Sequence, residues 1–176
     1  MPHYPAIASG LAIPGGPQAL PRARVPAAGR HVVVDPASAR LFMIENGEIR
    51  DSMRVIVGKP GTATPAIRST LYYATLNPYW NVPTDLARTL IAPKVLKDGM
   101  GYLHERGYEV VSSFKDDGRI LDPESVDWGA VAAGEAGVRV RQRPGPANSM
   151  GRVKFGFAND DGIYLHDTPK KELFAE

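Results

Sequence analysis

The stretch 30-RHVVVDPASARLFMIENGEIRDSMRVIVG-58 predicts how the fold begins. It contains three runs that are rich in β-branched and other apolar residues, HVVVD, ARLFMIE and EIRDSMRVIVG. The dipeptide Asn46-Gly47 separates the second run from the third, and this pair favours the tight turn of a two-residue β-hairpin. The stretch therefore predicts a three-stranded antiparallel sheet.

Further strand-like runs follow along the rest of the chain. They are IRSTLYYATLN (67–77), GYEVVSSF (107–114), VRVRQR (138–143), GRVKFGF (151–157) and GIYLH (162–166). Apolar and polar residues alternate in these runs, as is typical of sheets with one solvated face. Together with the first stretch they predict a mainly β fold, a β-sandwich of mixed sheets.

Helical signals are confined to the middle of the chain. Thr84 stands where it could cap a helix over DLARTLI. Pro93 suits the first turn of another short helix, because its missing N–H is not needed there. These signals predict a short αβ insertion, at about residues 84–128, that interrupts the strands.

Length and composition limit the possible classes. Residues 1–29 are rich in proline and glycine and show no strand or helix period, which predicts a linker or extended arm. Residues 30–176 have the length of one domain. With 43% apolar and 23% charged residues, a folded domain is expected.

Charge, hydropathy and cysteine content exclude several functions. A formal net charge of +2 does not favour a nucleic-acid partner. No apolar run approaches the roughly 18 residues that cross a bilayer, so no transmembrane segment is expected, and no export signal is seen. The 176 residues contain no cysteine, which excludes disulfides, thiolate zinc sites and a cysteine nucleophile among them.

His166 is the candidate catalytic residue, at the end of the run GIYLH. Ile163 and Leu165 are expected to point to one face of this strand. Tyr164 and His166 would then share the other face. A lone histidine at a strand end is most often a structural residue, whereas the functional interpretation is a general base. Pro169 restricts Thr168 to extended geometry, so the turn after the histidine is expected to be firm.

Two other stretches allow a structural and a functional interpretation. The loop NPYWNVP (77–83) places Trp80 between two prolines, where it could pack in the core or form the wall of a ligand cleft. Arg139, Arg141 and Arg143 have a spacing of two, so their side chains share one face of a strand. Such a stripe is most often simply solvated, and if it is functional it would suit carboxylate groups.

The order of several motifs is more specific than any of them alone. MRVIVGKPGTATP, NPYWNVP, GYLHERGYEVV, VDW, NSMGRVKFGF and IYLHDTPKKELF follow one another along the chain. In this order they resemble the catalytic domain of the L,D-transpeptidase (YkuD) family, from about Arg30 onward, and most closely the branch with a large capping insertion. The resemblance implies an enzyme of the cell envelope, in the periplasm, that acts on peptidoglycan stem peptides in cell-wall biogenesis and cell shape.

The resemblance also implies a mechanism. In this family the histidine of the HDTP-like segment serves a cysteine further along the chain, and the thiolate attacks the diaminopimelate carbonyl of a tetrapeptide stem. D-Alanine leaves, a thioester forms, and an amine of a second stem takes the acyl group. No metal or organic cofactor is implied, and β-lactams of the carbapenem class are expected to inhibit the complete enzyme. Since the sequence ends at Glu176 before such a cysteine, we expect this chain alone to be inactive.

Residue roles follow from the same resemblance. His166 is expected to activate the thiol. The other candidates would contact the substrate or shape the cleft, and they are Tyr164, Trp80, Asn148, Gly151, Arg152 and Asp167. Asp167 is expected to shape the turn after the histidine, and the insertion at about 84–128 to form a lid over the donor stem.

Two alternatives remain at this stage. A serine hydrolase would need an activated serine, but Ser149 in NSMGR lacks the strand, elbow and helix of a G-x-S-x-G nucleophile. A non-catalytic peptidoglycan-binding β module is the stronger alternative, because aromatic and arginine side chains could hold the polymer without reacting with it. The coding sequence beyond Glu176 would distinguish an enzyme from a binding module.

Overall fold

The computed structural model describes residues 28–160 and 162–174, so most of the predicted arm of residues 1–29 lies outside the described residues. The chain divides into two compact units. Among the described residues the first, called the β unit, comprises residues 28–73, 155–160, 162–165 and 170–174. The second, called the αβ unit, comprises Ala74–Lys154 and His166–Pro169.

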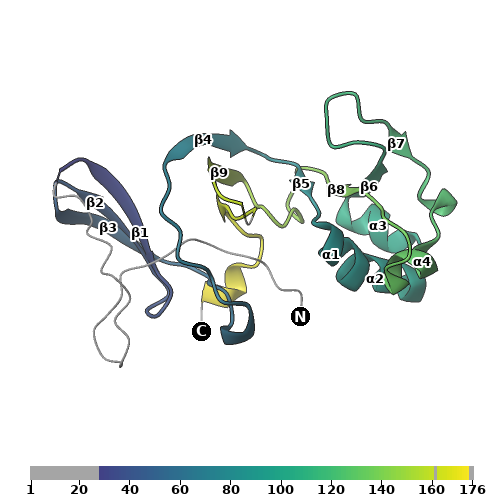
Figure 1. Cartoon of the computed structure of the whole chain (residues 1–176), viewed down its shortest axis with the longest axis horizontal. Helices are drawn as coiled ribbons and strands as arrows, with labels where there is room; N and C mark the ends of the chain where they lie inside the picture. The colour runs from purple at the N-terminus through teal and green to yellow at the C-terminus, as the bar shows by residue number, and fades with distance from the viewer. Residues whose placement is uncertain (1–27, 161, 175–176) are drawn as a thin grey trace. The chain divides into compact units, whose positions relative to one another are not determined.

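The predicted N-terminal sheet is present in the β unit as an antiparallel sheet of order β1-β2-β3 (Figure 1). Its strands are β1 (Arg30–Asp35), β2 (Arg40–Glu45) and β3 (Glu48–Arg54). Asn46 and Gly47 join β2 to β3 with φ angles of 52° and 81°. Positive φ at both central residues matches the twist of the flanking strands, so the hairpin prediction is confirmed.

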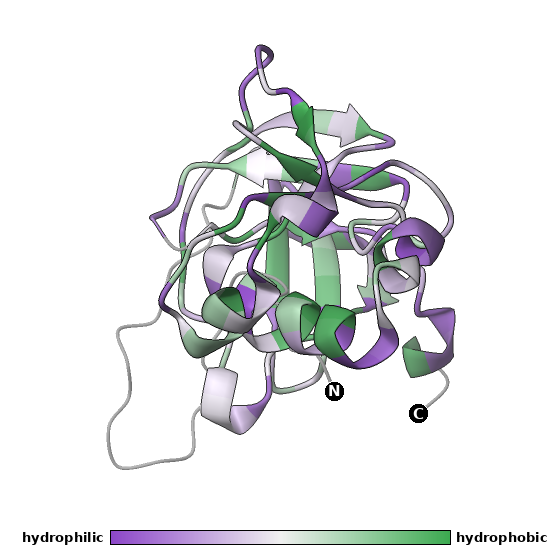
Figure 2. Cartoon of the chain, turned by 90° about the vertical axis from the view of Figure 1, so that its right-hand side faces the viewer, coloured by the Kyte–Doolittle hydropathy of each residue, from purple (hydrophilic) through white to green (hydrophobic). Residues whose placement is uncertain are grey.

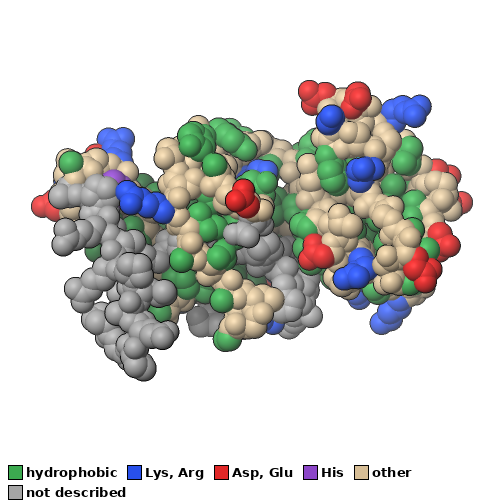
Figure 3. All heavy atoms as spheres, viewed as in Figure 1, with side chains coloured by type: hydrophobic (Ala, Val, Ile, Leu, Met, Phe, Trp, Pro, Cys, Tyr) green, Lys and Arg blue, Asp and Glu red, His purple; other side chains and the backbone are tan. Residues whose placement is uncertain are grey.

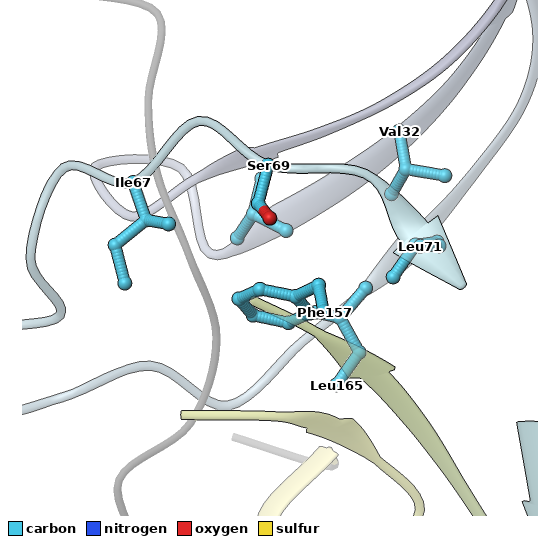
Figure 4. Close-up of a pocket in the computed structure, with 7 residues that line it drawn as sticks. Val32, Ile67, Ser69, Leu71, Phe157 and Leu165 are labelled. Atoms are coloured by element: carbon cyan, nitrogen blue, oxygen red, sulfur yellow. The ribbon is translucent and has the colours of Figure 1, made fainter. Parts of the chain in front are cut away.

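A small apolar core holds the β unit together. Val34, Leu41 and Leu165 are buried, and Val55, Val57 and Phe157 pack against them. Beside this core lies an open hollow with mostly apolar side chains around it (Figure 4), whose labelled lining residues are Val32, Ile67, Ser69, Leu71, Phe157 and Leu165. The 3₁₀ turn Lys171–Phe174 follows, and the Arg54 guanidinium donates to the Phe174 carbonyl at 2.9 Å.

A second sheet has the order β10-β9-β4, and the division between the units falls within its strands. The strands are β4 (Leu71–Leu76), β9 (Val153–Phe157) and β10 (Leu165–His166). Within the β unit the Tyr73 ring lies against Gly156, where a Cβ atom would collide with it. Apolar side chains stay exposed along β4, as the green surface around it in Figure 3 shows.

The αβ unit contains a four-stranded antiparallel sheet of order β5-β8-β6-β7 and several short helices. The strands are β5 (Trp80–Asn81), β6 (Tyr108–Val111), β7 (Ile120–Leu121) and β8 (Val140–Gln142). The helices are α1 (Thr84–Leu86), the π-helical turn Ala87–Ile91, α2 (Ala92–Asp98), α3 (Gly101–Arg106), the 3₁₀ turn Pro123–Ser125 and α4 (Trp128–Ala133).

The start of α1 corrects one prediction. Thr84 does not cap the helix: Pro83 holds the N-cap position, and no side chain makes a capping bond. The reason is that the Pro83 carbonyl already accepts from the Ala87 N–H at 2.9 Å, which makes Thr84 a helical residue. Pro93 does lie in the first turn of α2, as predicted, and the π-helical turn before it suits a residue without an N–H.

Apolar faces of the helices supply the core of the αβ unit. Ile91, Val95, Leu103 and Trp128 are all at most 4% exposed. In Figure 2 the helices carry hydrophobic residues next to hydrophilic ones, as amphipathic helices do. Among the described residues no helix is long and apolar enough to span a membrane. The mainly β fold, with three mostly antiparallel sheets and a few short helices, is confirmed.

Candidate functional site

His166 is half-buried at the end of β10. Its Nδ1 atom lies 2.6 Å from the Asp167 carbonyl oxygen, and its Nε2 atom is buried. A carbonyl oxygen can only accept a hydrogen bond, so this contact assigns the proton of a neutral imidazole to Nδ1. Nε2 then carries the lone pair and can accept a proton from a nucleophile.

Asp167 connects the end of β10 to the turn before β9. Its N–H donates to the Val153 carbonyl at 2.9 Å, and its Oδ2 accepts from the Arg152 N–H at 3.0 Å. Gly151 lies against the Asp167 side chain with a φ of 61°. The structure thus brings together three predicted site residues, Gly151, Arg152 and Asp167, next to His166 in the αβ unit.

Asn148 lies in the same region but is only 1% exposed. Its Nδ2 donates to the carbonyl oxygens of Pro78, Gln142 and Arg143 at 3.0, 3.2 and 2.9 Å. Its Oδ1 accepts from the Met150 N–H at 2.7 Å. The side chain therefore organises the loop that leads into Gly151, while a contact with substrate stays a prediction.

Gln142 was not among the predicted site residues, although it supports the same loop. Its Nε2 donates to the carbonyl oxygens of Arg106 and Ala147 at 2.8 and 2.9 Å, and its Oε1 accepts from the Ser149 N–H at 2.9 Å. The alternation in VRVRQR could have indicated it, because Gln142 falls on the face opposite the arginines. Ser149, the residue weighed for a serine hydrolase, is 4% exposed.

The two aromatic candidates fall in different units. Trp80 belongs to the αβ unit and is 6% exposed, with its ring centroid 6.4 Å from that of Tyr108, so it packs in the core of that unit. Tyr164 belongs to the β unit and is half-buried. Ile163 and Leu165 on either side of it are buried, which agrees with the predicted alternation. Substrate contacts of Trp80, Tyr164, Gly151 and Arg152 stay predictions.

The arginine stripe lies on and beside β8 and is largely engaged within the αβ unit. Arg141 pairs with Glu109 at 2.8 Å, and its guanidinium lies over the Tyr79 ring at 4.5 Å. Arg143 lies 3.7 Å from Glu109, and Arg139 donates to the Ser112 carbonyl at 3.3 Å. Figure 3 shows basic and acidic side chains interspersed over this unit. The stripe is therefore not a concentrated anion site.

Among residues 28–160 and 162–174, no group of three or more His, Cys, Asp or Glu residues could hold a metal ion.

Comparison with known proteins identifies the family of this chain. The model of the YkuD family, described as the L,D-transpeptidase catalytic domain, matches residues 29–176. A curated protein of Haemophilus influenzae with the name "Putative L,D-transpeptidase" is 34% identical over 143 residues. That match covers 81% of this chain but 28% of the relative, so the chain spans less than a third of the relative's length. Because the family match extends over most of its residues, the chain belongs to the YkuD family of L,D-transpeptidase catalytic domains.

Proposed function

We propose that this domain cross-links diaminopimelate residues of peptidoglycan stem peptides through a cysteine thioester. The observation that carries the proposal is the contact of His166 Nδ1 with the Asp167 carbonyl, which makes Nε2 the basic nitrogen. The family supplies the reaction class. The 176 residues contain no cysteine, so the proposal assigns the nucleophile to a part of the protein beyond them.

The proposed reaction has two transfers. The thiol gives its proton to Nε2 of His166, and the thiolate attacks the diaminopimelate carbonyl carbon of the donor stem. The bond to D-alanine breaks, and the departing amine takes the proton from the imidazolium. An amine of the acceptor stem then attacks the thioester, loses a proton to Nε2, and releases the thiolate. The new amide is the cross-link.

In this proposal the αβ insertion, at about residues 84–128, forms a lid over the donor stem. Water competes with the acceptor amine for the thioester, and a cover that excludes water would favour transfer over hydrolysis. Residues 84–128 contain the helices α1, α2 and α3 and the strands β6 and β7, so the predicted lid is a folded element rather than a loose loop. The proposal includes a location in the periplasm, where cross-linking of peptidoglycan would contribute to cell-wall biogenesis and cell shape; the proposed substrate supports it.

The experiment uses the protein that carries the cysteine and compares His166→Ala with His31→Ala. His31 is a half-buried histidine in β1 of the β unit, as His166 is half-buried in its own unit, and it serves as the matched control. We expect His166→Ala to lower cross-link formation and acylation by a carbapenem by at least about 100-fold, the scale of a lost general base. The free energy of unfolding should change by less than about 1 kcal/mol, since the half-buried ring contributes little packing. Muropeptide analysis and intact-mass spectrometry measure the two reactions.

Several outcomes would contradict this function. Undiminished transfer by His166→Ala would remove the histidine from the mechanism. A protein that binds peptidoglycan but forms neither thioester nor cross-link would be a binding module. The cysteine-free chain of 176 residues should gain no mass from a carbapenem, and an adduct on it would instead indicate a serine nucleophile.

A further inference from the structure

Asp167 lies where the end of β10 meets the turn before β9. Its main-chain carbonyl determines the tautomer of His166, while its side chain contacts the turn before β9. We propose that the Asp167 carboxylate is a positioning group, which clamps the Gly151–Arg152 turn and thereby holds the carbonyl against His166 Nδ1. The kinetic part of this inference rests on the proposed function, whereas the structural part does not.

The clamp has two hydrogen bonds on successive residues of one strand end. Oδ2 of Asp167 accepts from the Arg152 N–H at 3.0 Å, and the Asp167 N–H donates to the Val153 carbonyl at 2.9 Å. Two bonds from one residue to neighbouring peptide groups restrict both the side chain and the backbone of Asp167. The bond to Oδ2 has a carboxylate acceptor, and such charge-assisted bonds are the stronger ones in proteins.

Gly151 shows that the turn is fitted to this carboxylate. A Cβ atom at position 151 would lie 2.5 Å from Asp167 Oδ2 and 2.6 Å from Asp167 Cβ, closer than van der Waals contact allows. The φ of 61° at Gly151 also favours glycine. The Gly151 N–H donates to the Asn148 carbonyl at 2.9 Å, so the buried Asn148 supports the other side of the turn.

The carbonyl of Asp167 is restricted from the downstream side as well. Pro169 limits Thr168 to extended conformations, so the peptide group between Asp167 and Thr168 has little freedom to rotate. Because the Arg152 N–H also holds the Asp167 carboxylate, the Asp167 carbonyl stays 2.6 Å from His166 Nδ1. A free imidazole in water prefers the proton on Nε2, and the clamp therefore maintains the less common tautomer, the one with a basic Nε2.

The test compares Asp167→Ala, which removes the carboxylate bond of the clamp and keeps the backbone bond to Val153, with Asp167→Asn, whose side-chain oxygen can still accept from the Arg152 N–H. Asp35→Ala is the control, because Asp35 accepts from the Ala37 N–H at 2.9 Å in a turn of the β unit. Side-chain ¹⁵N spectra of the 176-residue chain report the tautomer of His166 without any catalysis. We expect the Nδ1–H form in the wild type and in Asp167→Asn, and a shift toward the Nε2–H form in Asp167→Ala alone.

In the protein that carries the cysteine, Asp167→Ala should lower the rate of carbapenem acylation by about 10- to 100-fold, the cost of a small misplacement of a catalytic group. The acylation rate of Asp167→Asn should stay within about 3-fold of the wild-type rate, because the side chain retains an oxygen that accepts from the Arg152 N–H. An unchanged His166 tautomer in a folded Asp167→Ala protein, or an equal tautomer shift in Asp35→Ala, would overturn the positioning role. A shifted tautomer in a protein that forms no thioester would preserve the clamp and refute the proposed function instead.

Discussion

Replacement of Asn148 by alanine should destabilise the αβ unit by about 2–4 kcal/mol, because a buried amide that satisfies several peptide groups would be lost. The two Nδ2 hydrogens are shared among three carbonyl oxygens at 3.0, 3.2 and 2.9 Å, and Oδ1 accepts one N–H at 2.7 Å. Two donated bonds and one accepted bond, at about 1 kcal/mol each, give the middle of the range. Water that enters the vacated space would lower the cost, and peptide groups left without partners would raise it.

Tryptophan fluorescence is suited to this measurement. The chain has two tryptophans, Trp80 and Trp128, and both are buried in the αβ unit at 6% and 3% exposure. Urea unfolding followed by their emission therefore reports on this unit. Asn81→Ala is the matched control, since Asn81 is exposed on β5, and it should change the free energy of unfolding by less than about 0.5 kcal/mol.

Asn148→Asp sharpens the same prediction. It keeps Oδ1 but turns a carboxylate oxygen toward three carbonyl oxygens, and burial among acceptors raises the pKa of the introduced carboxyl above its ordinary range. The folded state then binds the proton more tightly, so the deficit in stability should be smaller at pH 5 than at pH 8. A loss below about 1 kcal/mol for Asn148→Ala, at an unchanged urea m-value, would refute the reasoning.

Two further predictions concern single positions. Gly58→Ala should cost the β unit about 1–3 kcal/mol in circular dichroism melts, because its Cβ would collide with the Thr62 carbonyl and lie 2.8 Å from the Thr64 nitrogen. Gly61→Ala, with no atom within 4 Å of the added Cβ, should be nearly neutral, and equal losses for both would contradict this account. Burial lowers the pKa of the Lys154 ammonium from its ordinary value of 10.5. Near that pH the unfolded chain therefore binds more protons than the folded chain, and the free energy of unfolding should rise as the pH approaches 10.5. Lys154→Met should reduce that rise in urea titrations at pH 8 and 10, and an identical rise in both proteins would exclude Lys154 as its source.

Local features of the sequence determined much of the fold. Asn46 and Gly47 adopt the positive φ angles that a two-residue hairpin requires, so the first sheet could be predicted from a dipeptide between apolar runs. The period of two in GIYLH similarly predicted that Ile163 and Leu165 would share one face, and both are buried. The predicted helix cap at Thr84 also came from local sequence and was wrong. The choice between neighbouring start positions of a helix depends on a small difference in local hydrogen bonding.

The site depended on contacts that no local pattern contains. Asn148 reaches the Pro78 carbonyl across 70 positions of sequence, and Arg141 meets Glu109 only because the register of β8 against β6 places them opposite each other. The sequence alone indicated His166 as the base, through the motif around it. Which of its nitrogens is basic, and how Asp167 fits Gly151, followed only from the tertiary structure. The physical reason is that backbone preferences act over a few residues, whereas hydrogen-bond partners and steric fit are set by which distant segments pack together.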